Sequence, residues 1–127
     1  MKRALTLLIT AASLAACTPK PPKVSIVKPS GHSVSVAMLQ KVNSAAYNCW
    51  AKDKAFKPYG IVPELDTTGT PRILVIPKGK PQSLPKLVIT ATGRSVQTFG
   101  PLAEGEMAGR INADVTRWAA GDTGCAA

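Results

Sequence analysis

The sequence predicts an α+β domain in which one helix precedes a three-stranded antiparallel sheet and a second helix follows it. Apolar side chains recur every three or four residues between 39 and 50, as on the buried face of a helix. Segments rich in β-branched residues lie between 72 and 99 and are separated by proline and glycine, as strands are. A second apolar stripe at helical spacing covers 107–118. We place this domain at residues 32–127.

The N-terminus has the pattern of a secretory signal segment. Met1-Lys2-Arg3 is followed by an apolar run that is too short to span a bilayer. The run ends in Leu14-Ala15-Ala16-Cys17, which resembles the lipobox of bacterial lipoproteins. The resemblance implies that a signal peptide, residues 1–16, is removed and that Cys17 carries acyl chains such as palmitate. A plain signal peptide followed by an ordinary cysteine is the alternative.

The same resemblance implies a location in the bacterial cell envelope. Thr18 follows the lipidated cysteine, and the absence of Asp at that position favours the outer membrane under the enterobacterial sorting rule. We therefore expect a lipid anchor in the inner leaflet of the outer membrane, facing the periplasm, although the inner membrane remains open.

Residues 17–31 comprise the lipidated cysteine and a tether rich in proline and lysine. Its prolines disfavour a helix and favour an extended polyproline II conformation. At about 3.1 Å per residue, the tether could hold the domain up to roughly 40 Å from the bilayer. Spacing is the expected role, and its three lysines could also contact anionic headgroups.

Three cysteines occur in the chain, and the lipid accounts for Cys17. Cys49 and Cys125 then form an even pair in an oxidising compartment, so we expect a disulfide between them. The bond would close a long loop and stabilise the fold by roughly 4 to 4.5 kcal/mol in the chain-entropy treatment. Free thiols or a redox pair are the alternatives, and the sequence has no Cys-x-x-Cys spacing to activate a thiol.

The first helix is expected to begin at a cap provided by Ser33 or Ser35 and to run to about Phe56. Its apolar stripe includes Cys49 and Trp50. Residues 58–71 are rich in proline, glycine and threonine and are expected to form a loop, in which Ile61-Val62 could be a short edge strand.

Residues 72–76 are apolar on both faces, which predicts a central strand. Residues 86–91 and 95–99 flank a glycine-containing turn and are expected to form a hairpin. The last helix is expected to start near Leu102, or nearer Glu106 because of the glycines around it, and to be capped by Gly121.

The sequence offers little for catalysis. His32 is the only histidine, it has no partners at metal-ligand spacing, and no Gly-x-Ser-x-Gly motif is present. The acidic pairs Glu64/Asp66 and Glu104/Glu106 are better explained as a solvated loop and as helix-start acids. Trp50 and Trp118 lie on the apolar stripes, where core packing is favoured over a ligand platform. We expect a protein that is not an enzyme and has no cofactor or metal; a small envelope enzyme is the least favoured alternative.

The chain is strongly basic. Its formal charge is +9, and removal of Lys2 and Arg3 with the signal peptide leaves +7. Nucleic acid is a poor partner for an exported chain, whereas anionic lipid or peptidoglycan is accessible to an anchored one. Lys78, Lys80 and Lys86 are the candidate anion-binding residues, and a solvated basic surface without a partner is the alternative.

The expected elements are a helix that carries Cys49-Trp50, a short antiparallel sheet and a final helix followed by a cysteine. Over about 36–125, this order of elements resembles the C-terminal domains of TolA and TonB. The resemblance implies a module that binds envelope proteins partly by adding a strand to a sheet edge. We therefore expect a non-catalytic lipoprotein that acts as a periplasm-facing protein-binding or structural module. A binder of anionic envelope polymer or lipid is the alternative.

Overall fold

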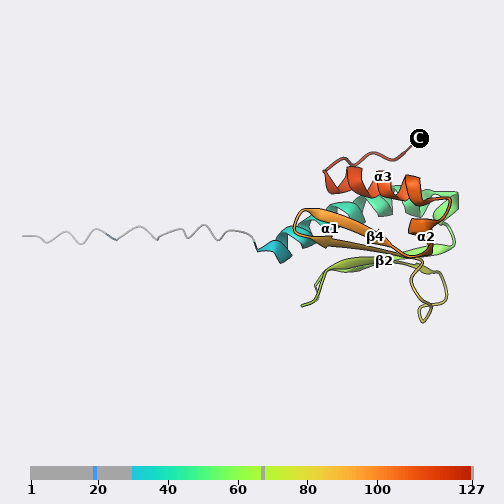
Figure 1. Ribbon diagram of the computed structural model, residues 1–127, viewed down its shortest axis with the longest axis horizontal. Coiled ribbons are helices and arrows are strands. Elements are labelled where there is room, and N and C mark those ends of the chain that lie inside the picture. The colour runs from blue at the N-terminus through green and yellow to red at the C-terminus, as the bar shows by residue number, and fades with distance from the viewer. Residues whose placement is uncertain (1–18, 20–29, 67, 127) are drawn as a thin grey trace, which may run out of the picture.

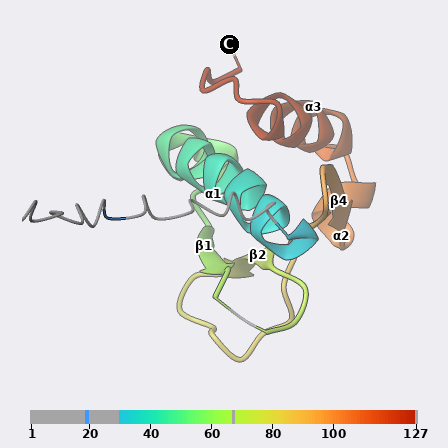
Figure 2. The same cartoon turned by 90° about the vertical axis from the view of Figure 1, so that its left-hand side faces the viewer.

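The computed structural model describes residues 19, 30–66 and 68–126 (Figure 1). Cys17, the signal segment and most of the tether lie outside these residues. The fold has two layers, a four-stranded antiparallel sheet and a layer of helices that covers one of its faces. In Figure 2, α1 (Gly31–Cys49) lies over β1 and β2, while α3 (Ala108–Ala119) lies on the β4 side.

The strands form a meander in the order β1-β2-β3-β4, and each strand pairs with the next along the chain. Their bounds are β1 (Tyr59–Glu64), β2 (Arg72–Pro77), β3 (Leu87–Thr92) and β4 (Ser95–Phe99). The inner strand β2 and the β3–β4 hairpin confirm the strands expected from the sequence.

The expectation of three strands was wrong, because β1 is a full strand that pairs with β2 along its whole length. Gly60 and Pro63 interrupt its β-branched pattern, so the sequence indicated only a short possible strand. Proline is tolerated here because β1 lies at the edge of the sheet, where one row of backbone groups has no neighbouring strand.

The first helix starts and ends differently from the expectation. Its N-cap is Ser30, whose hydroxyl accepts a hydrogen bond from Ser33 N (3.1 Å), rather than Ser33 or Ser35. The α-helix ends at Cys49 and is followed by two 3-10 turns, η1 (Trp50–Lys52) and η2 (Lys54–Phe56). The Asp53 carboxylate starts the second turn by accepting a bond from Ala55 N (2.8 Å), so the chain bends before Phe56.

The last helical segment is split into α2 (Pro101–Glu104) and α3. Gly105 adopts an extended conformation between them (φ −91°, ψ −161°), which ends the first piece after one turn. Gly121 follows α3 with φ +103°, a conformation that favours glycine, and confirms the expected cap. The bond from Asp122 N to Arg117 O (3.1 Å) completes this cap.

The core lies between the helices and the sheet, and three aromatic rings meet in it. Trp50 stacks on Phe56 with ring centroids 4.5 Å apart and meets Trp118 edge-on at 5.0 Å. Both tryptophans are fully buried, which confirms the packing role expected for them. Asp114 of α3 lies among these rings and is only 2% exposed. Its carboxylate accepts bonds from Trp50 Nε1 (2.9 Å) and from Arg117 Nη2 (2.7 Å).

Cys49 and Cys125 form the expected disulfide, with their Cα atoms 5.3 Å apart. The bond ties the end of α1 to the segment that follows α3. This segment is also held by Trp118 Nε1, which donates to Gly124 O (2.9 Å). The Asp122 carboxylate accepts bonds from Gly124 N (2.8 Å) and Arg117 (3.0 Å), and these bonds lower its pKa below its ordinary value.

Replacing both cysteines, as Cys49→Ala/Cys125→Ala, is expected to lower the free energy of unfolding by about 2–5 kcal/mol, because the bond closes a loop of 76 residues. Urea denaturation measures this difference. A reducing agent should bring the unmodified protein to the stability of the double variant and leave the variant unchanged. A loss below about 1 kcal/mol would contradict a main stabilising role for the bond.

Candidate protein-binding surface

The two edges of the sheet differ in how well they are protected. Lys78 N donates to Pro58 O (2.9 Å) just beyond the β1–β2 pair. Because bonded pairs alternate along an antiparallel ladder, the outward backbone groups of β1 belong to Tyr59, Ile61 and Pro63. The carbonyl of Ile61 already accepts a bond from the Tyr47 hydroxyl (2.7 Å), and Pro63 has no N–H. The β1 edge is therefore protected against another strand at two of its three outward positions, Ile61 and Pro63.

The β4 edge has none of these protections. Thr92 pairs with Ser95 across a two-residue turn that starts at Gly93 (φ +60°), so the same alternation directs the backbone groups of Val96 and Thr98 outward. No other segment of the described chain donates to or accepts from these groups. The strand Ser-Val-Gln-Thr-Phe also carries no proline and no charge, the two features that commonly protect an edge.

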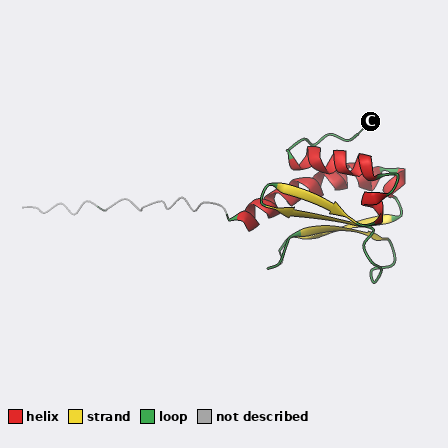
Figure 3. Cartoon of the chain, in the orientation of Figure 1, coloured by secondary structure: helices red, strands yellow, loops and turns green. Residues whose placement is uncertain are grey.

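An apolar row crosses the face of the sheet that the helices leave open. It takes one residue from each strand in direct register: Val62, Leu74, Val88 and Phe99. Val62 is 41% exposed and Phe99 is 52% exposed, so both ends of the row are open to solvent. Figure 3 shows α1 and α3 together on the opposite side of the sheet. Phe99 belongs to β4, so the row reaches the unprotected edge.

The three candidate lysines lie at one end of the sheet. Lys78 and Lys80 follow β2, and Lys86 precedes β3, where its N–H donates to Val75 O (2.8 Å). Gly79 between the first two has φ +72° and forms a turn, as its sequence context indicates. All three side chains are exposed, and the structure brings their backbones to the same end of the sheet.

Arginines account for every ion pair in the described chain. The paired acids are Asp53, Glu64, Asp114 and Asp122, and their partners are Arg72, Arg110 and Arg117. The bond from Ala55 N and the contact with Arg110 lower the pKa of Asp53, which keeps it ionised. No described lysine has a carboxylate within ion-pair distance, so the lysine charge is available to a partner.

The remaining polar candidates do not gather into a catalytic group. His32 is exposed in the first turn of α1, and Glu64 pairs with Arg72 across β1 and β2. Glu104 ends α2, while Glu106 lies between α2 and α3. Among residues 30–66 and 68–126, no three histidine, cysteine or acidic side chains are grouped to hold a metal ion. In the same ranges no helix combines the length and hydropathy needed to cross a bilayer.

The chain matches none of the protein-family models, curated proteins or solved structures with which it was compared. The candidate surface therefore rests on geometry. Sequence patterns had indicated a sheet edge and the three lysines but neither the choice of edge nor the apolar row. The alternation of apolar and polar residues in β3 and β4 was the available signal. Only the register of all four strands shows that the apolar residues form one row.

Proposed function

We propose that this chain is a non-catalytic, lipid-anchored module of the bacterial cell envelope that binds a partner protein by pairing with the edge of β4. The observation that carries the proposal is the contrast between the unprotected β4 edge and the partly protected β1 edge at the opposite side of the sheet. An extended segment can add to such an edge through main-chain hydrogen bonds, while side-chain contacts on either face provide specificity.

The apolar row supplies the side-chain part of this interface. A strand added beside β4 would place a residue next to Phe99, on the open face of the sheet, and an apolar residue there would extend the row. Burying the half-exposed Phe99 ring is favourable, because aromatic side chains near an interface centre contribute strongly to binding.

The proposed location depends on the N-terminal residues and is supported by the cysteine chemistry. Leu14-Ala15-Ala16-Cys17 provides the acceptor for lipid, and the tether would hold the domain away from the membrane. The Cys49–Cys125 disulfide suits an oxidising compartment such as the periplasm. We place the anchor in the inner leaflet of the outer membrane.

The anchor is tested by mass spectrometry of membrane fractions, in which Cys17 should be an acylated N-terminal residue. Cys17→Ser removes the acceptor and should move the protein out of the membrane fraction. Thr18→Ser, next to it, should leave the protein in the membrane fraction. An unmodified Cys17 in a protein recovered outside the membrane would leave the plain signal peptide as the explanation.

The binding mode is tested at Thr98. Thr98→Pro removes an outward N–H and places a ring on the edge, so partner binding should weaken about tenfold or more. Thr98→Val is the matched control, because it removes the hydroxyl bond to Asn112 and keeps the N–H. A photo-crosslinking residue at Gln97 identifies the partner in cells, and the purified pair gives the affinities.

Hydrogen exchange makes the same test specific to the edge. The amides of Val96 and Thr98 should exchange rapidly in the free protein and become protected in the complex. Equal affinities of the Thr98→Pro and Thr98→Val variants, with no added protection at these amides, would rule out strand addition at β4.

A second candidate function is binding of anionic lipid or peptidoglycan, which the unpaired lysines favour. Lys78→Glu/Lys80→Glu/Lys86→Glu should weaken binding of the Cys17→Ser protein to phosphatidylglycerol vesicles on the order of 100-fold, since each lysine near such a surface contributes about 1 kcal/mol. Lys41→Glu/Lys52→Glu/Lys54→Glu changes the net charge equally and is the control. Equal losses in the two triple variants would show only a general charge effect.

A further inference from the structure

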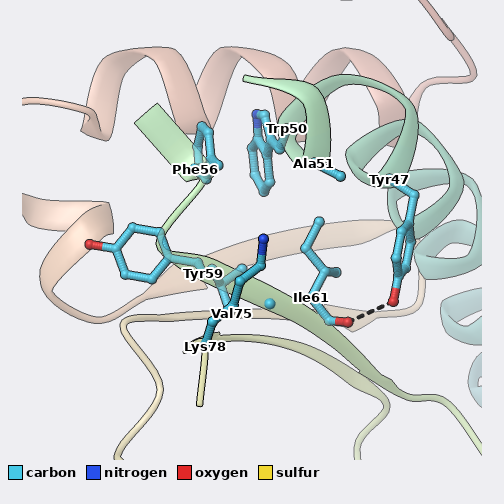
Figure 4. A pocket seen from close by; sticks show the side chains of 9 residues that line it. Tyr47, Trp50, Ala51, Phe56, Tyr59, Ile61, Val75 and Lys78 are labelled. Atoms are coloured by element: carbon cyan, nitrogen blue, oxygen red, sulfur yellow. Dashed lines mark hydrogen bonds between the residues drawn. The ribbon is translucent and has the colours of Figure 1, made fainter. Parts of the chain in front are cut away.

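A cavity of about 270 Å³ lies beside β1, at the opposite edge of the sheet from β4 (Figure 4). The end of α1, the two 3-10 turns and the first half of β1 surround it. Trp50, Phe56 and Val75 form its buried floor, while Tyr47, Ala51 and Lys78 are exposed around it. Neither the proposed strand addition nor the apolar row uses these side chains.

The aromatic walls are held in place before any ligand arrives. Trp50 is fixed by its bond to the buried Asp114 and by stacking on Phe56. Tyr47 is fixed by its bond to Ile61 O, which Figure 4 shows at one side of the cavity. A site formed in advance requires little ordering when a ligand binds, and this favours affinity.

Lys78 is the single charged residue among those that line the cavity. Figure 4 shows its ammonium group directed into the space between the aromatic rings. Its backbone N–H is bonded to Pro58 O, which holds the start of the turn against β1. Asp53, which lies in sequence between the lining residues Ala51 and Phe56, is bound to Arg110 and Ala55 N, and no carboxylate lines the cavity. The cavity thus combines apolar aromatic walls with one uncompensated positive charge.

We propose that this cavity binds a small carboxylate that carries a single aromatic ring. The ring would contact the aromatic and aliphatic walls, and the carboxylate would pair with the Lys78 ammonium group. The volume is slightly below the roughly 300–1,000 Å³ of pockets for drug-sized ligands, which favours one ring with a short acid chain over a lipid acyl chain.

The probe is 3-phenylpropionate, with 3-phenyl-1-propanol as its neutral counterpart. Titration of the full chain, followed by amide shifts at Ala51 and Gly60, should give a dissociation constant of about 1 mM or below for the acid. Lys78→Met should weaken the acid about three- to fivefold and leave the alcohol unchanged, as for an exposed ion pair. Lys80→Met, in the same turn but outside the cavity, should change neither.

Two further variants complete the test. Ala51→Phe adds a ring at the exposed rim without altering the buried floor and should abolish binding of both compounds. Thr98→Pro should leave both affinities unchanged, which separates this site from the proposed partner interface. The proposal is overturned if the acid gives no saturable shifts at Ala51 and Gly60 up to about 10 mM. It is equally overturned if Lys78→Met and Lys80→Met have the same effect on the acid.

Discussion

The arrangement of the helices depends on the hydrogen bond between the buried Asp114 carboxylate and the indole N–H of Trp50. Asp114 lies on α3 and Trp50 directly follows α1, so this bond joins the two helical segments. A buried charge destabilises a fold unless it is paired and hydrogen-bonded, and here Arg117 and the indole N–H meet that requirement. The bond also sets the position of the Trp50 ring, on which Phe56 stacks. The disulfide adds a covalent link beside this contact.

This placement of α1 makes the two edges of the sheet unequal. With its end fixed by Trp50, the helix brings the Tyr47 hydroxyl to the carbonyl of Ile61 on β1. On the far side, α3 reaches β4 through the Thr98 hydroxyl and Asn112, a side-chain contact on the helical face that leaves the outward backbone groups unbonded. One helical layer therefore occupies an outward carbonyl of the β1 edge and leaves the outward backbone groups of β4 free.

Sequence patterns were sufficient where a local signal and the tertiary structure agree. The apolar stripe of α1, the apolar run of β2 and the hairpin each have a signal within one segment. The disulfide follows from the even number of cysteines that remain once Cys17 is assigned to lipid. The full length of β1 had no such signal, because Gly60 and Pro63 are both unfavourable in most strands and proline is accepted mainly at an edge. Asp114 was also missed, because an acid on an amphipathic helix is ordinarily solvent-facing, and its partner lies 64 residues away. The open edge at β4 depends on register, which single segments do not encode.

The division of labour between arginine and lysine indicates which charges belong to the fold. Arginine presents a planar set of donors that can hold a carboxylate in a fixed orientation, and all five ion pairs of the described chain use it. Lysine is a flexible point charge, and no described lysine takes part in such a pair. Because the acids that matter structurally are already paired with arginine, removing a lysine charge leaves none of them unpaired. The positive charge at Lys78 and its neighbours is thus independent of the packing that stabilises the domain. It can therefore serve the binding of a partner at that end of the sheet.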